Sequence, residues 1–135
     1  MRNLAYALVQ VVHNFGAATV IGTAVASLWF VRDNIAIQGK LALVMAVAWA
    51  VQLLSGAAFG ATSYYYAGHF PDIHGVAIAA LGIKLVCASA GFLLAASYVK
   101  WGSVWPARGR FYTWCALTAL AVTALSSAAF LRWFS

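Results

Sequence analysis

The strongest constraint on this chain is how few of its residues carry a charge. Only 7% of the 135 residues are charged and 65% are hydrophobic, whereas a soluble domain has roughly a quarter of its residues charged. Four apolar stretches are long enough to cross a bilayer, which takes about 20 residues per helix: residues 4–31, 41–62, 73–99 and 111–131. The composition predicts an integral membrane protein and excludes a soluble domain, a disordered chain and a disulfide-built secreted scaffold.

The connections between these stretches are short, and both prolines fall within them. Short connections make consecutive helices antiparallel neighbours. We therefore expect an all-α, up-down four-helix transmembrane bundle that forms a single domain over residues 1–135. The first stretch is expected to remain as a helix rather than to be a cleaved signal peptide, because it is long and carries Gln10, His13 and Asn14 in its middle.

The basic residues favour one orientation in the membrane. The net charge is +6, but the basic side chains are scattered singly at the ends of apolar stretches, so we expect lipid headgroups and not nucleic acid as their partner. The first and third connections carry Arg32, Lys40, Lys100, Arg108 and Arg110. Cytoplasmic loops are enriched in Lys and Arg, which places both termini and the middle connection on the outer, periplasmic side of the inner membrane.

Aromatic residues gather at the predicted ends of the spans, with the run Tyr64-Tyr65-Tyr66 at the outer side. Amphipathic rings prefer the headgroup layer, so an aromatic belt is the favoured interpretation. Binding of a quinone or of a partner protein by the tyrosine run is the alternative.

Polar side chains inside the spans are the most informative feature, because each needs a partner or a role in hydrocarbon. At 1.5 Å rise per residue, His13 lies roughly 13 Å below the outer surface, and Gln52 and Lys84 lie about 15 Å below it. Thr123 is expected near the same depth. The four spans are therefore predicted to contribute polar groups to one layer near the bilayer midplane.

His13 is a candidate ligand of haem or of a metal ion, because a neutral imidazole binds iron well and is tolerated in hydrocarbon. The alternative is a histidine that hydrogen-bonds to Gln52 or to a helical Ser or Thr and holds helices together. His74 is the natural second ligand on the third span. Its depth differs from that of His13 by about 10 Å, so ligation from a partner subunit is an alternative.

Lys84 is the most costly residue, because a lysine at a helix centre costs about 2.5–3.5 kcal/mol on insertion scales. The only acids, Asp33 and Asp72, lie outside the spans. A haem propionate or an acid on another subunit would supply a countercharge, and this is the favoured interpretation. The alternatives are a lysine kept uncharged by burial or one that extends toward the outer interface.

Other chemistry has weaker support. His69, Asp72 and His74 have a spacing that is only weakly suggestive of an outer copper or zinc site. The sequence shows no Ser-His-Asp set, no pair of carboxylates within the spans and no phosphate-binding loop. We therefore do not expect an enzyme that acts alone.

The run His13-Asn14-Phe15-Gly16-Ala17-Ala18, followed by Gly22, resembles the first helix of small membrane cytochrome b-like and copper-resistance D-type proteins. The resemblance covers about 20 residues. It implies a four-helix, haem-binding or redox-associated membrane subunit with His13 as a ligand. This chain departs from the pattern because it has no histidine at the same depth on its other spans.

Two hypotheses follow. The first is a membrane subunit of a larger redox complex, a haem b-binding anchor between a periplasmic partner and the quinone pool, in which His13, His74, Lys84 and Gln52 contact the cofactor. The second is an accessory subunit of a membrane complex that binds no cofactor of its own. A small channel is less favoured, because no carboxylate lies in the spans.

Overall fold

The computed structural model describes residues 1–134, and its regular structure is helical throughout that range. Four long helices follow one another, with a short π-helical segment after the first and a single 3₁₀ turn after the third. Their bounds are α1 Arg2–Val25, η1 Ala26–Phe30, α2 Ile35–Ala67, α3 Val76–Trp101, η2 Gly102–Val104 and α4 Ala107–Phe134. The predicted all-α four-helix bundle is confirmed.

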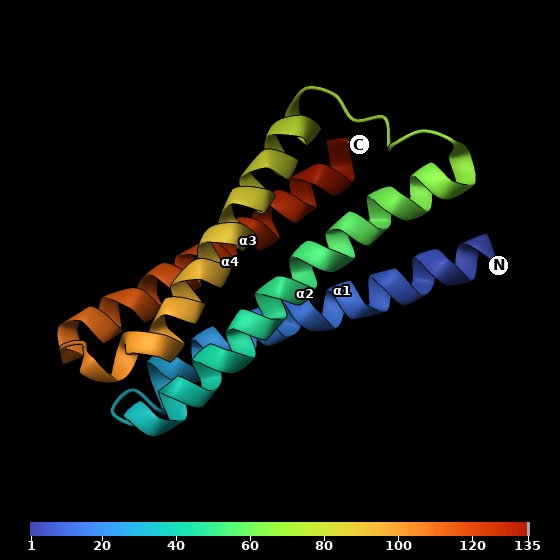
Figure 1. Ribbon diagram of the computed structural model, residues 1–135. Coiled ribbons are helices and arrows are strands. Elements are labelled where there is room, and N and C mark those ends of the chain that lie inside the picture. Colours follow the sequence, from blue (N-terminus) through green and yellow to red (C-terminus); the bar gives the residue numbers. More distant parts are fainter. Residues whose placement is uncertain (135) are drawn as a thin grey trace.

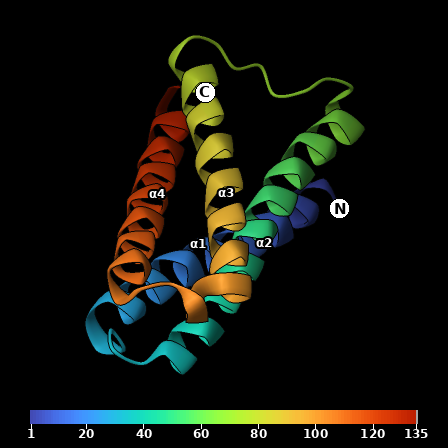
Figure 2. The same cartoon turned by 60° about the vertical axis from the view of Figure 1, so that its left-hand side comes forward.

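Consecutive helices run antiparallel and pack on one another, α1 on α2, α2 on α3 and α3 on α4 (Figure 1). α1 also contacts α4. We call the end with the connections 31–34 and 102–106 the closed end. Toward the connection 68–75, at what we call the open end, the α1–α2 pair diverges from the α3–α4 pair (Figure 2). The N-terminus and the last turns of α4 lie at the open end, so the bundle has the shape of a V.

The packed core lies in the closed half of the V. Trp49, Tyr98, Trp114 and Leu117 belong to it, and each is almost completely buried. Along the described length of α1, no residue before Gly16 is buried, because this half of the helix lies where the two helix pairs diverge. The core therefore holds the closed half together and leaves the open half with fewer tertiary contacts.

All four helices are long and apolar enough to cross a membrane. Large apolar side chains such as Leu54 and Val86 point outward and are exposed, which suits helices surrounded by lipid tails as apolar as leucine itself. The chain is an integral membrane protein.

Local capping, and not hydropathy, sets the ends of α2. The Asn34 side chain accepts a hydrogen bond from the Ile37 amide at 3.0 Å, a typical N-cap. At the other end Gly68 adopts a left-handed conformation with φ 77°, which glycine adopts without strain. α2 is therefore longer at both ends than the expected span 41–62 and includes Lys40, which was expected in a connection. α3 begins later than the expected residue 73.

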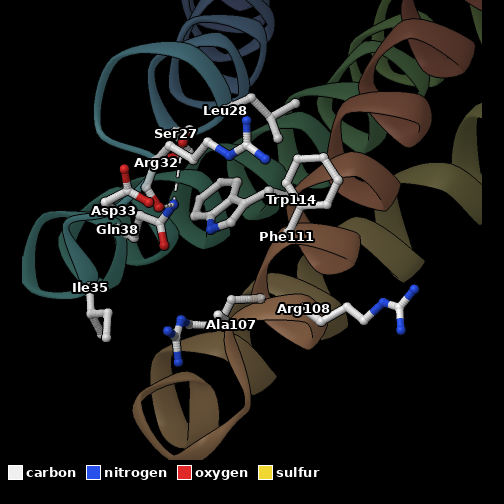
Figure 3. A pocket seen from close by; sticks show the side chains of 11 residues that line it. Ser27, Leu28, Arg32, Asp33, Ile35, Gln38, Ala107, Arg108, Phe111 and Trp114 are labelled. Carbon is white, nitrogen blue, oxygen red and sulfur yellow. Dashed lines mark hydrogen bonds between the residues drawn. The ribbon is translucent and has the colours of Figure 1, made fainter.

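A pocket of about 380 Å³ lies at the closed end, where the α1–α2 connection faces the start of α4 (Figure 3). Ser27 and Arg32 line it from the end of the α1 region, and Phe111 and Trp114 line it from α4. It is separate from the polar residues of the middle layer, which lie farther toward the open end.

Close helix packing depends on glycine at a contact between α2 and α3. A Cβ atom on Gly91 would lie 2.5 Å from Nε1 of the buried Trp49, closer than real Cβ atoms approach other heavy atoms. A Cβ atom on Gly82, also in α3, would meet no atom within 4 Å. Gly91 is therefore needed for the close packing of α3 on α2, whereas Gly82 in the same helix is not.

We expect Gly91→Ala to destabilise the bundle by about 1–3 kcal/mol, because the added methyl group must displace a packed indole ring. Gly82→Ala is the matched control and should leave the stability unchanged or slightly raised, since alanine favours the helix. Unfolding titrations in mixed detergent micelles measure both. Equal stability of the two variants would contradict the packing described here.

Candidate functional site

His13 of α1 and Lys84 of α3 meet between the two arms of the V. The Lys84 Nζ atom lies 2.9 Å from the His13 Nε2 atom, and both residues are half-buried. Lys84 is in the third turn of α3, and His13 lies one turn before Gly16, the first buried residue of α1. This contact therefore joins the two helix pairs near the point where they diverge.

The hydrogen bonds around His13 assign a role to each ring nitrogen. The Ser55 hydroxyl donates to the Val51 carbonyl at 2.6 Å, so its oxygen acts as the acceptor toward His13 Nδ1, also at 2.6 Å. Nδ1 then carries the proton, and Nε2 accepts a hydrogen bond from Lys84. We infer this tautomer from the network, as is usual for histidine. His13 is thus a neutral imidazole whose Nε2 atom accepts a hydrogen bond from a lysine.

Gln52 fixes the backbone of α1 beside His13. Its side-chain Nε2 donates to the His13 carbonyl at 2.6 Å, and Gln52 is buried. Gly16 permits this approach, because a Cβ atom there would lie 2.5 Å from Gln52 Nε2. Phe59 also contacts the imidazole edge-on, with ring centroids 6.0 Å apart. Three helices therefore position one histidine.

The arrangement suits an anionic group. A lysine ammonium has three N–H donors, and within residues 1–134 the sole hydrogen-bond partner of Lys84 Nζ is His13. Two donors therefore remain for a ligand. Neither Asp33 nor Asp72 lies in a helix, so the chain brings no acid of its own to this lysine.

The structure brings together three of the four predicted site residues, namely His13, Gln52 and Lys84, and it leaves out His74. His74 lies in the connection 68–75, before α3 begins, and not on an inward helix face as expected. Its Nε2 pairs with Asp72 Oδ1 at 2.8 Å, and the two side chains are 81% and 80% exposed. The imidazole of His74 therefore does not join His13 in a bis-histidine pair.

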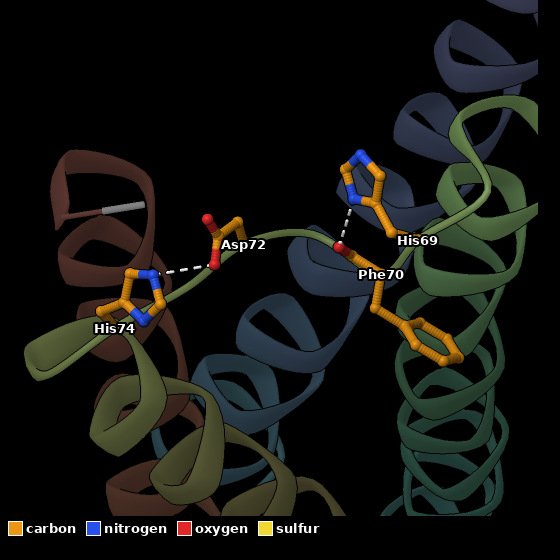
Figure 4. Close-up of polar contacts among 4 residues, drawn as sticks. All are labelled: His69, Phe70, Asp72 and His74. Carbon is orange, nitrogen blue, oxygen red and sulfur yellow. Dashed lines mark hydrogen bonds and ion pairs between the residues drawn. The ribbon is translucent and has the colours of Figure 1, made fainter.

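The other histidine of that connection is separate as well. The His69 ring lies at the α2 end and bonds the Phe70 carbonyl at 2.9 Å, whereas His74 lies at the α3 end beside Asp72 (Figure 4). In the part of the chain that the structure describes, no three His, Cys, Asp or Glu side chains are close enough to hold a metal ion. The His-Asp-His spacing in the sequence does not become a cluster in space.

The polar layer also has fewer contributors than expected. The Gln10 side chain bonds Asn14 within α1 at 2.7 Å, on the exposed side. On α4 the Thr123 hydroxyl bonds the Ala119 carbonyl of its own helix at 2.8 Å and is exposed. The layer is therefore built by α1, α2 and α3, and α4 supplies no side chain to it among these contacts.

A second buried polar cluster, at the closed end, is not predicted by the sequence analysis. The Gln38 Oε1 atom accepts from the Tyr98 hydroxyl at 2.8 Å, and Gln38 Nε2 donates to the carbonyls of Ser27 and Arg32 at 3.3 and 3.2 Å. Gln38 falls in the segment expected to be a connection, so its burial was not expected. The Asn34 cap was the available signal, because it starts α2 early enough to include Gln38.

A double-mutant cycle tests the His13–Lys84 contact. We expect His13→Leu and Lys84→Met each to destabilise the bundle, because each leaves the other polar group without its partner. The double variant should lose less free energy of unfolding than the sum of the losses in the two single variants, with a coupling energy of about 1–3 kcal/mol.

The exposed pair Asp72 and His74 is the control for this cycle. Asp72→Asn combined with His74→Gln should show a coupling within about 0.5 kcal/mol, as exposed ion pairs do. Additive effects of His13→Leu and Lys84→Met would show that the two side chains do not interact in the membrane.

The chain matches no family model, no curated protein and no solved structure in the comparisons made. The resemblance of the first-helix residues to cytochrome b-like proteins therefore stays a prediction. The function is inferred from the chain's own side chains, and above all from the contact between Lys84 and His13.

Proposed function

We propose that this chain is a membrane subunit of a larger redox complex and that His13 and Lys84 form its cofactor-facing site. The observation that carries the proposal is the contact between Lys84 Nζ and His13 Nε2 within the bundle. Neither of the two acids of the chain, Asp33 and Asp72, lies in a helix. A lysine within a membrane span is expected to face a partner and to mark a functional site. We propose that the partner of Lys84 beyond His13 is an anionic group of a cofactor or of another subunit.

The donor set suits haem b with one histidine from this chain. Ser55 holds His13 Nδ1 at 2.6 Å, and such a contact from the second nitrogen orients a histidine for ligation through Nε2. Lys84 occupies the Nε2 lone pair in this structure, so it would have to leave this nitrogen for His13 to bind iron, and its ammonium group could then pair with a propionate. Gln52 would keep the α1 backbone in place, and haem, when bound, would supply one-electron chemistry. Because His74 is held by Asp72 in the connection, any further protein ligand would come from a partner subunit.

The proposed orientation places the closed end in the cytoplasm. The basic residues at that end are Arg32, Lys40, Lys100, Arg108 and Arg110, and a cytoplasmic excess of such residues is the usual pattern. The open end, with the tyrosine run and the connection 68–75, would then face the periplasm of a bacterial-type inner membrane. A periplasmic partner and the quinone pool would exchange electrons at this end.

The orientation is tested with a cysteine placed at Gly68, in a variant whose Cys87 and Cys115 are replaced by alanine. We expect a membrane-impermeant maleimide to label this cysteine from the periplasmic side, in spheroplasts. A cysteine at Gly109, at the closed end, should be labelled only after the membrane is permeabilised. The reverse pattern would invert the proposed topology.

The visible spectrum of the purified protein, alone and with its copurifying partners, tests the haem proposal. We expect a reduced-minus-oxidised Soret band and α band that disappear in His13→Ala and persist in His74→Ala, because only His13 lies in the site. Size-exclusion profiles of the variants show whether they still fold. An absence of bands in both preparations would rule out haem.

The second candidate is an accessory subunit without a cofactor of its own, and one observation favours it. Both ring nitrogens of His13 already have partners within the chain, in Ser55 and Lys84, so the site needs no iron to be satisfied. Here Lys84 would pair with an acid on another subunit. This candidate gains support if no spectrum is found and Lys84→Met loses the copurifying partners.

A further inference from the structure

The pocket at the closed end collects arginines from segments far apart in the sequence. Arg32 lines it from the α1–α2 connection, and Arg108 and Arg110 line it from the first turns of α4. The Arg108 guanidinium points away from the other lining side chains (Figure 3) and lies over the Tyr112 ring, outside the pocket. Its volume of about 380 Å³ is within the range of small-ligand sites. It lies at the end of the bundle opposite to the connection 68–75, so the inference drawn from it does not depend on the proposed function.

The guanidinium groups lack carboxylate partners. Arg32 stacks on the Phe111 ring with its Cζ atom 4.8 Å from the centroid, and Arg110 donates to the Trp105 carbonyl. Asp33 also lines the pocket, but across residues 1–134 the one ion pair is that of Asp72 with His74. The guanidinium groups of Arg32 and Arg110 thus belong to a pocket with one carboxylate, and the N–H donors of a guanidinium can bind an anion such as phosphate in a bidentate manner.

Two fully buried donors in the pocket wall have no hydrogen-bond partner. Ser27 and Trp114 line the pocket and are both 0% exposed. Within the described chain, the Ser27 Oγ and Trp114 Nε1 atoms have no partner. Figure 3 shows the Trp114 indole in the middle of the lining residues, between Gln38 and Phe111. The Nε1 atom of Trp49, in the packed core, has no partner either. The two donors of the pocket wall therefore support a ligand that accepts hydrogen bonds through their position beside the arginines, and not through their burial alone.

We infer that this pocket binds the phosphate of an anionic phospholipid headgroup. Phosphate oxygens are strong acceptors that arginine binds in a bidentate manner, and basic pockets between transmembrane helices are typical sites for acidic lipids. The lining also includes the apolar side chains of Leu28, Ile35 and Phe111, which suits the glycerol backbone and the start of an acyl chain better than a free ion. The pocket lies at one end of helices that are long and apolar enough to span a membrane, where we expect lipid headgroups.

The test uses the full-length protein in a neutral detergent. Thermal unfolding and native mass spectrometry are measured with phosphatidylglycerol, with phosphatidylcholine and with inorganic phosphate alone. We expect phosphatidylglycerol to raise the unfolding temperature and to bind one molecule per chain. The two other additions should have little effect.

Variants of the pocket give the matched comparison. Arg32→Gln should weaken phosphatidylglycerol binding about tenfold, because one charge-assisted hydrogen-bonding group is lost. Arg132→Gln, the same change near the end of α4 and outside the pocket, should leave the affinity unchanged. Asp33→Asn should strengthen binding, because it removes the one negative charge from the wall.

Ser27→Ala separates binding from folding. Removing a buried hydroxyl without a partner should leave the unfolding temperature in lipid-free detergent unchanged or higher, yet should reduce the shift caused by phosphatidylglycerol. Three results would each overturn the inference: equal effects of phosphatidylglycerol and phosphatidylcholine, equal loss of affinity in Arg32→Gln and Arg132→Gln, or full stabilisation by inorganic phosphate alone, which would point to a soluble anion.

Discussion

A lysine within a membrane-spanning helix, in a chain with no acid in any helix, is the constraint around which the middle of this protein is built. Its Nζ atom lies 2.9 Å from the Nε2 atom of His13, and the tautomer inferred from the hydrogen-bond network is a neutral imidazole with its proton on Nδ1. The Ser55 oxygen accepts a hydrogen bond from Nδ1, and the Gln52 side chain donates to the backbone carbonyl of His13. A substitution of His13, Ser55 or Gln52 would therefore change the surroundings of the Lys84 Nζ atom.

The position of this network follows from the shape of the bundle. The closed half is filled by aromatic and small side chains, as in the contact of Trp49 with Gly91, and its buried polar side chain Gln38 is hydrogen-bonded to Tyr98. In the open half the helix pairs diverge (Figure 1), and nothing before Gly16 on α1 is buried. His13 and Lys84 lie between these regions, where a charge can be partly shielded by protein and still be reached by a ligand from the open side.

The depth of a residue in the membrane can be predicted from its position along a helix. The direction in which its side chain points around the helix axis cannot be predicted in the same way. The rise per residue placed His13, Gln52 and Lys84 in one layer, and the structure joins all three. The same arithmetic included Thr123, which is exposed and bonds its own helix, because rotation about the axis depends on packing. His74 was expected on a helix face, but α3 begins only at Val76. Buried Gln38 was missed because the cap at Asn34, and not hydropathy, decides where α2 starts.

The few charged residues of this chain thus lie in two different surroundings, which set different energetic costs. At the closed end, arginines are exposed to the headgroup layer, where water and phosphate compensate them at small cost, and several can gather around one pocket. In the middle layer a single lysine is present, because each further uncompensated cation there would add several kcal/mol to the cost of insertion. A Met or Leu at position 84 would insert into the membrane at lower cost, but it would leave the Nε2 atom of His13 without its hydrogen-bond partner. Lys84 and its contact with His13 are therefore the structural feature on which the proposed function depends.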